Sequence, residues 1–312
     1  MPIVFHMEPT RPPMNWEAFK TQMPRRSIAV DGFVNAPPCY DLQSQHFNFD
    51  HHAGPPRPAM LSSAMQVRSW IHDGLLTLLM PTGDEEVHVW MNDCDPDVAL
   101  CYYAFVHHFI VAPMVNPALN RLFGHVDTMD KRAGLVDLPR DMEIVRQAAW
   151  IFQPYWDFRM SGALDRKDPG EHMGVLESIA GRIDDFASAR GKSVSIEDDY
   201  ETLHRGAGWE MVREIGPHAR MKLARRQVRA FASVRQTPSG RWYYTLCRYA
   251  PVTYWFPVPE IGRRLSEQEP EAAFGGGDTV MGNARGPGST RGPEEMAQAI
   301  DQILILLKVS PP

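Results

Sequence analysis

The sequence predicts an α/β protein, with one domain built on a parallel sheet with flanking helices and a smaller α+β C-terminal domain. Two observations support this prediction. Between residues 27 and 110, apolar runs of strand length alternate with stretches whose apolar residues recur at helical spacing, an order typical of parallel α/β sheets. Between residues 228 and 307, β-rich runs and a glycine-rich stretch precede a final apolar helix.

Five elements of the first region can be placed in order. The predicted strands are SIAVDGF (27–33), HFNFDHH (46–52) and EVHVWMND (86–93), because each is a short apolar run. The predicted helices are LSSAMQVRSWIHDGLLTLL (61–79) and PDVALCYYAFVHHFI (96–110), because their apolar residues have helical spacing. Ligands bind at the carboxyl ends of the strands in such sheets, so the residues that end these strands are the first candidates for a site.

The second half changes character twice. The pattern is helical from about 141 to 228 and β-rich over 228–258, where Thr237-Pro238-Ser239-Gly240 predicts a turn between two strands. The glycine-rich stretch 274–293 follows, and a helix over 294–307 closes the chain. Pro293 suits the first turn of that helix.

These patterns predict three regions. Residues 1–26, rich in Pro, Met and Arg, form an extended N-terminal arm. Residues 27–215 form the first domain with a helical extension. Residues 216–312 form the smaller domain, and the boundary itself is expected somewhere between 195 and 220.

Composition excludes several classes of protein. The 312 residues suffice for two domains of about 100–200 residues each. A net charge of −6 argues against a general nucleic-acid coat. No secretory signal is visible, and the most apolar run, 102–115, is shorter and more polar than the roughly 20 residues that span a bilayer. The four cysteines form no CxxC pair and indicate a reducing compartment, so we expect a cytoplasmic protein that does not engage a membrane. They are Cys39, Cys94, Cys101 and Cys247.

Three groups of acidic and imidazole side chains stand at the ends of predicted strands. They are Asp31, the triplet Asp50-His51-His52, and the run Asp93-Cys94-Asp95-Pro96-Asp97. Neighbours in a strand point to opposite faces, so the triplet can converge on one ion only where the backbone turns. The alternative for Asp31 or the triplet alone is an ordinary polar surface turn.

The acidic run indicates a cation. Three carboxylates this close repel one another unless cations neutralise them. Oxygen ligands suit Mn²⁺ or Mg²⁺, and an added imidazole favours Mn²⁺. The alternative is an acidic turn that caps a helix N-terminus, where carboxylates are also favoured. A fourth group, His125, Asp127 and Asp130 in GHVDTMD, offers the same choice between a metal site and a helix cap.

Together these motifs resemble the DHH phosphoesterase superfamily, which includes manganese-dependent inorganic pyrophosphatases, nanoRNases, single-strand-specific exonucleases and cyclic-dinucleotide phosphodiesterases. Asp93 to Asp97 is similar to the family's Asp-rich turn, and Asp31 to its single Asp at a strand end. Asp50-His51-His52 resembles the DHH triplet, and Asp127-Thr128 the later Asp motif. The resemblance covers residues 27–130 well and 228–305 loosely.

The resemblance implies roles for these residues. The metal ligands would be Asp31, His51, Asp95, Asp97 and Asp127, with Asp31 bridging two ions and Asp93 as a further candidate. Asp50 and His52 would contact the ligands or the substrate, and with Arg285 they are the candidate catalytic groups. One departure stands out. The family's Asp-rich turn comes first in the chain, whereas here it follows the triplet by about forty residues. The order is that of a circular permutation, which can still build the same site.

The glycine-rich stretch is similar to the GGGH-like loop of the family's smaller domain. The candidate substrate-binding residues are therefore Gly275, Gly276, Gly277, Asp278 and Arg285. Asp278 stands where a His is common, and Arg285 could take over anion binding through its bidentate guanidinium. The alternative is that the glycines make the segment flexible.

These inferences predict a metal-dependent phosphoesterase. Two ions, Mn²⁺ or Mg²⁺, about 3.5–4 Å apart would activate a bridging water. The substrate would be a small phosphorylated or nucleotide-type molecule or a short oligonucleotide, facing a basic segment over 220–248. The alternatives are a metal-dependent hydrolase of a molecule without phosphate and a non-catalytic metal-binding regulatory protein. A homodimer through the final ILILL helix is also compatible with the sequence.

Overall fold

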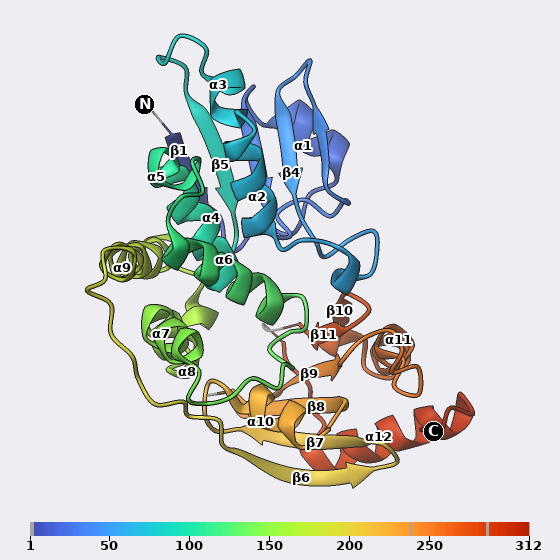
Figure 1. The fold of residues 1–312 in the computed structure, drawn as a ribbon. Helices are drawn as coiled ribbons and strands as arrows, with labels where there is room; N and C mark the ends of the chain where they lie inside the picture. The colour runs from blue at the N-terminus through green and yellow to red at the C-terminus, as the bar shows by residue number, and fades with distance from the viewer. Residues whose placement is uncertain (1–2, 238, 285–286, 312) are drawn as a thin grey trace. The chain divides into compact units, whose positions relative to one another are not determined.

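The computed structural model describes residues 3–237, 239–284 and 287–311 (Figure 1). It is a mixed α/β structure with 42% helix and 19% strand in two mixed sheets, which confirms the α/β class. The chain divides into two compact units. The first holds residues up to Lys131 and Pro139–Ser195, and the second holds Arg132–Leu138 and residues from Ile196 onward. Each unit is described by itself below.

The sheet of the first unit has five strands, and all neighbouring pairs but one are parallel. The exception is the edge strand β3, which pairs antiparallel with β4, so the sheet is mixed where the sequence predicted a parallel one. The parallel register brings the carboxyl ends of β2, β4 and β5 to one edge. The strands in spatial order are β1 (Ile3–Met7), β5 (Val87–Met91), β2 (Ser27–Val30), β4 (His46–Phe49) and β3 (Cys39–Asp41).

The N-terminal residues do not form the extended arm that the sequence suggested. Residues 3–7 form β1, which pairs with β5 over its whole length. Helix α1 (Trp16–Gln22) follows, capped by the Asn15 side chain, which accepts from the Ala18 N–H. Phe19 of this helix is fully buried. The prolines between β1 and α1 gave the segment its irregular pattern, although IVFHM by itself has the length of a short strand.

Helices complete the first unit. The predicted helix over 61–79 is present in two pieces, because Gly74 at φ 94° starts a new helix after α2 ends. The predicted helix over 96–110 likewise divides at His107. Their apolar faces and the sheet share one large buried cluster. The helices are α2 (Ser63–His72), α3 (Leu75–Leu79), α4 (Pro96–Val106), α5 (His108–Val111), α6 (Pro117–Asp130), α7 (Glu143–Ile151), α8 (Gln153–Met160) and α9 (Pro169–Ala187), with short 3-10 turns at Arg57–Ala59 and Ala163–Arg166.

The second unit is built on a six-stranded sheet in which β7 and β8 are the parallel pair and the other neighbours are antiparallel. The predicted β-rich region is confirmed by the hairpin of β8 and β9; Pro238 of its expected turn lies outside the described residues. The strands in spatial order are β10 (Phe274–Gly276), β11 (Val280–Asn283), β9 (Trp242–Arg248), β8 (Ala230–Gln236), β7 (Trp209–Glu214) and β6 (Tyr200–Gly206).

The expectation of helix throughout 141–228 is wrong for residues 200–214. They form the hairpin β6–β7, which turns at Gly208 with φ 75°. Charged residues such as Glu201 and Arg213 pair across these strands, so the apolar signal is weak and the segment looked helical. The helices of this unit are α10 (Ala219–Arg225), α11 (Val258–Gln268) and α12 (Pro293–Leu306), with a 3-10 turn at Pro270–Ala272.

The final helix α12 is present as predicted and packs within its own unit. Ile300, Ile303 and Leu304 are buried in a cluster with the sheet and α11. Ile305 and Leu306, from the same ILILL run, are 74% and 67% exposed. Among the described residues, no helix combines the length and the apolar character needed to cross a membrane.

Candidate metal centre

The carboxyl end of β2 places Asp31 at the edge of the first sheet. Its N–H still donates to the Phe49 carbonyl at 3.0 Å, so the ladder with β4 continues up to this residue. The chain then turns through two left-handed residues, Asp31 at φ 49° and Gly32 at φ 78°. Asp is one of the few residue types with a side chain that tolerate this conformation. The turn leaves the Asp31 carboxylate at the end of the strand, where it faces the loop after β4.

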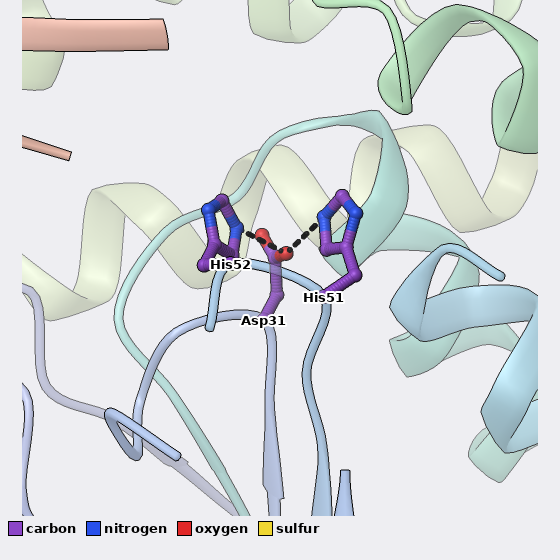
Figure 2. Close-up of side chains that lie close together, drawn as sticks. All are labelled: Asp31, His51 and His52. Carbon is purple, nitrogen blue, oxygen red and sulfur yellow. Dashed lines mark hydrogen bonds and ion pairs between the residues drawn. The ribbon is translucent and has the colours of Figure 1, made fainter. Parts of the chain in front are cut away.

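Two imidazoles flank that carboxylate. His52 Nε2 lies 2.9 Å and His51 Nε2 3.3 Å from Asp31 Oδ1. Figure 2 shows the two rings on either side of Asp31, although they belong to adjacent residues. This convergence is possible because β4 ends at Phe49 and the backbone turns directly afterwards. Of the triplet, His51 and His52 belong to this group, whereas the Asp50 carboxylate accepts from the backbone of the turn.

Asp50 shapes that turn. Its carboxylate accepts hydrogen bonds from the N–H groups of His52 at 3.1 Å and Ala53 at 3.2 Å. Its carbonyl accepts from Gln66 Nε2 at 2.9 Å. Asp50 is fully buried, and these hydrogen bonds hold the turn that presents the two imidazoles.

A second set of ligand atoms shares His51. One ligand atom each from His51, Asp97 and Asp130 lies within 4.8 Å of the others, and the same holds for Asp31, His51 and His52. His51 Nε2 is 2.9 Å from Asp130 Oδ2. The Asp97 carboxylate is held by the start of α2, because it accepts from the N–H groups of Ser63 at 2.8 Å and Ala64 at 3.1 Å. His51 is thus the common member of two overlapping groups.

Arg57, from the short turn before α2, joins the same cluster. Its Nη2 lies 3.1 Å from His51 Nε2 and 3.3 Å from Asp130 Oδ1. A protonated Nε2 that donates to a carboxylate cannot also accept from a guanidinium. The contacts around this nitrogen therefore cannot all be satisfied at once. Buried His51 Nδ1 and Arg57 Nε have no hydrogen-bond partner among the described atoms. A cation among the carboxylates would take the His51 Nε2 lone pair, and Arg57 would then pair with Asp130 alone.

The electrostatics of His51 reflect its carboxylate neighbours. Burial alone would lower the pKa of His51, but Asp130 and Asp31 outweigh burial and raise the pKa to about 11. Burial likewise opposes ionisation of Asp31, yet His52 and His51 hold the pKa of that carboxyl well below its usual range. His51 and Arg57 lower the pKa of Asp130 against the effect of its burial.

Two carboxyls of the acidic run, those of Asp97 and Asp95, show the opposite shift, because their pKa values are raised. Burial, followed by the charges of Asp130 and Asp31, raises the pKa of Asp97 to about 7. Burial and the charges of Asp31 and Asp93 raise the pKa of Asp95 well above its usual range. The edge of the sheet thus holds more carboxylates than its cationic side chains neutralise. Divalent cations would reverse these shifts.

The other metal ligands that the sequence predicted have different partners. Asp95 is the N-cap of α4 and accepts from the N–H groups of Asp97 and Val98 at 3.0 Å each. Asp93 lies with Cys94 and His172 instead of with His51. Asp127 accepts from the Ser62 N–H at 2.8 Å and pairs with Lys131 Nζ at 2.6 Å.

Asp130, one helical turn beyond Asp127, is the α6 residue in contact with His51. The GHVDTMD motif contains both carboxylates, but sequence alone could not tell which one faces the centre. Arg57 was missed altogether. It lies between prolines in a loop, where no periodic pattern marks a functional residue.

The first part of the glycine-rich candidate loop, residues 274–283, is a β-hairpin of the second unit. Gly275 and Gly276 lie in β10, and the Gly277 N–H donates to the Val280 carbonyl at 2.8 Å. Arg248 Nε donates to the Asp278 carbonyl at 2.8 Å. Arg285, proposed for anion binding, lies outside the described residues.

Several basic residues of the segment 220–248 form ion pairs with acidic residues of the same unit. Arg220 pairs with Glu214 at 3.0 Å and Arg225 with Asp198 at 3.1 Å, and Asp198 is buried. Arg248 lies 3.6 Å from Asp278. Part of the basic charge that the sequence suggested for an anionic substrate is therefore neutralised within the unit.

Comparison of the chain with family models, with curated proteins and with solved structures finds no match.

Proposed function

We propose that the chain is a metal-dependent hydrolase, most simply a phosphoesterase that acts on a small phosphorylated or nucleotide-type substrate. The observation that supports it is the meeting of two ligand groups at His51, one with Asp31 and His52 and the other with Asp97 and Asp130. They lie beyond the carboxyl ends of parallel strands, where α/β sheets bind their ligands.

The donor set fits hard divalent cations. Asp31, His51, Asp97 and Asp130 would hold them, with Asp95 beside them. Carboxylates with one or two imidazoles suit Mn²⁺ and, with fewer nitrogens, Mg²⁺. Bound there, such cations would supply an activated water and would neutralise charge on a phosphoryl group. The uncompensated carboxylates and the conflicting contacts of His51 Nε2 support this fit.

We propose that two side chains, His52 and Arg57, meet the anionic substrate. The His52 side chain is 41% exposed, and its ring is oriented by Asp31, so it can donate a hydrogen bond to a phosphoryl oxygen. Arg57 is held by Asp130 and can stabilise charge that develops during hydrolysis. Asp50 keeps the turn in the conformation that presents both imidazoles.

The resemblance to the DHH superfamily supports the same function. The departure in motif order does not remove that support, because β2, β4 and β5 bring Asp31, the triplet and the acidic run to one edge. Chain order does not matter to a site that depends on geometry. We extend the proposal to a cytoplasmic location and to a site with two ions.

Turnover by the full chain tests this proposal. Chelator-treated protein is assayed with Mn²⁺ or Mg²⁺ against a chromogenic phosphodiester, a phosphomonoester and a carboxylic ester. We expect metal-dependent turnover of a phosphoester, lost in Asp31→Asn and retained in the exposed control Asp73→Asn. Turnover of the carboxylic ester alone would favour a hydrolase of molecules without phosphate. Metal binding without any turnover would favour a non-catalytic regulatory protein.

A further inference from the structure

A third group of ligand-type side chains lies apart from His51. One ligand atom each from Asp93, Cys94 and His172 lies within 4.8 Å of the others. Asp93 and Cys94 follow β5, whereas His172 lies in the first turn of α9, nearly eighty residues later in the chain. Cys94 and His172 are 0% and 1% exposed, and Asp93 is half-buried. Both elements belong to the first unit.

The ring of His172 is held in one orientation. Its Nδ1 lies 2.7 Å from the Asp168 carbonyl, which can only accept, so Nδ1 carries the proton. The lone pair of the neutral ring is then on Nε2. The ring of Phe158 also packs edge-on against the imidazole at 5.2 Å. A histidine whose other nitrogen donates to a carbonyl is the usual arrangement of a metal ligand in proteins.

The donors from the β5–α4 turn are also placed. One oxygen of Asp93 accepts from the Cys94 N–H at 2.7 Å, which fixes the carboxylate beside the thiol. The ligands of one tetrahedral Zn²⁺ lie about 3.3–3.8 Å apart, because bonds of roughly 2.0–2.3 Å meet near the tetrahedral angle. The three ligand atoms lie within 4.8 Å of one another, so side-chain rotations that bring them at most about 1.5 Å closer place all three on one ion. Asp93 is only half-buried, so water can supply a fourth ligand on that side.

We propose that Asp93, Cys94 and His172 form a separate binding site for Zn²⁺ or a similar thiophilic divalent cation. A thiolate and an imidazole select Zn²⁺ over Mn²⁺ and Mg²⁺, which prefer oxygen donors, so the two centres differ in the metal they take. An ion here ties the start of α9 to the acidic turn after β5. It thereby fixes the segment that carries Asp95 and Asp97, and its role is structural.

Cobalt spectroscopy on the full chain tests this site. Co²⁺ binds zinc sites and gives a near-ultraviolet charge-transfer band only when a thiolate is a ligand. We expect that band in the metal-free wild-type chain after Co²⁺ is added, and we expect Zn²⁺ to displace it. Cys94→Ser removes the band. Cys101→Ala, a matched buried thiol on α4, keeps it.

Two further variants separate this site from the His51 centre and from misfolding. His172→Gln and Asp93→Asn each weaken Zn²⁺ binding by at least about tenfold, since even the partners of a ligand contribute that much. Asp31→Asn keeps the cobalt band, because it alters only the other centre. No band in the wild type, or a band that survives in Cys94→Ser, overturns the proposal. Circular dichroism shows whether each variant is folded. If Cys94→Ser is not folded, Zn²⁺ binding by His172→Gln decides the case.

Discussion

At the scale of single residues, His51 has several contacts that depend on charge. Its Nε2 lies near two carboxylates and one guanidinium, and its Nδ1 has no partner among the described atoms. No single protonation state satisfies all of these neighbours. Asp97 and Asp130 differ from His51, because each has a group that holds it in place. Backbone N–H donors hold Asp97, and Arg57 holds Asp130.

The choice between the two carboxylates of α6 can be tested directly. We expect Asp130→Asn to weaken Mn²⁺ binding by at least about tenfold, because Asp130 contacts His51 whereas Asp127 is occupied by Ser62 and Lys131. Asp127→Asn, the matched control, keeps an oxygen for the Ser62 N–H and should change binding by less than about threefold. Isothermal titration calorimetry measures both. The reverse order would favour Asp127 as the ligand, as the family resemblance implies.

Stability of the metal-free chain should fall as pH rises above about 6.5, because below that pH the lowered pKa of buried His218, about 4, opposes the raised pKa of Asp97. The pKa of the Asp97 carboxyl is about 7 in the folded chain, against an ordinary value of 3.8, so between these pH values the folded chain keeps a proton that the unfolded chain loses. The same holds for His51 between its ordinary pKa of 6.5 and its raised pKa of about 11. Wherever the folded chain binds more protons, the free energy of unfolding decreases with rising pH. The lowered pKa values of Asp31 and Asp130 act in the opposite direction, but only below their ordinary value of 3.8.

Metal ions compete with those protons, so Mg²⁺ should raise the melting temperature more at pH 8 than at pH 6. Thermal unfolding with and without Mg²⁺ at the two pH values measures the difference. His51→Ala serves as the control, because it removes a proton site and a ligand together and should reduce the pH effect. An equal or larger shift at pH 6 would contradict a centre built on His51 and Asp97.

At the scale of elements, residues 274–283 of the glycine-rich stretch form a hairpin whose glycines are not equivalent. Gly276 has φ 140°, and a Cβ there would lie 2.6 Å from the Val280 carbonyl oxygen. Nothing lies within 4 Å of a Cβ at Gly275. The need for glycine at position 276 is therefore conformational, and the sequence motif alone did not distinguish this need from a role in binding substrate.

Gly276→Ala should lower the free energy of unfolding by about 1–3 kcal/mol, the usual cost of a strained backbone position. Gly275→Ala, one residue away, should change it by less than about 0.5 kcal/mol. Urea unfolding followed by fluorescence gives both values. Equal effects would indicate that the hairpin does not require a positive φ at position 276.

The helices and strands also show how much of the fold could be predicted from the sequence. The strands ending near Asp31, Asp50 and Asp93 were placed because each is a short run rich in apolar residues. Strands β6 and β7 were missed because charged residues occupy their exposed face, and β1 because prolines follow it. The break of helix 61–79 depends on Gly74, whose positive φ is a property of packing and turn geometry that periodicity does not reveal.

At the scale of the whole molecule, each unit has its own hydrophobic clusters. One large cluster covers the sheet of the first unit, and another joins the sheet of the second unit with α11 and α12. Leu135 packs with Val212 and Phe231. It lies in Arg132–Leu138, a short segment from the first half of the chain that belongs to the second unit. Sequence could not assign that segment, because its place depends on contacts distant in the chain.

Hydrogen exchange should therefore respond to metal in one unit only. We expect Mn²⁺ to slow exchange at the ends of β2 and β4, at the start of α2 and in the last turns of α6, because Asp31, His51, Asp97 and Asp130 become fixed there. Amides of β8 and β9, in the second unit, serve as the internal reference and should exchange at unchanged rates. Mass spectrometry of peptides from chains exchanged with and without Mn²⁺ measures both. Equal protection in the strands of both units would contradict a metal centre confined to the first unit, and the hydrolase proposed for it would need another site.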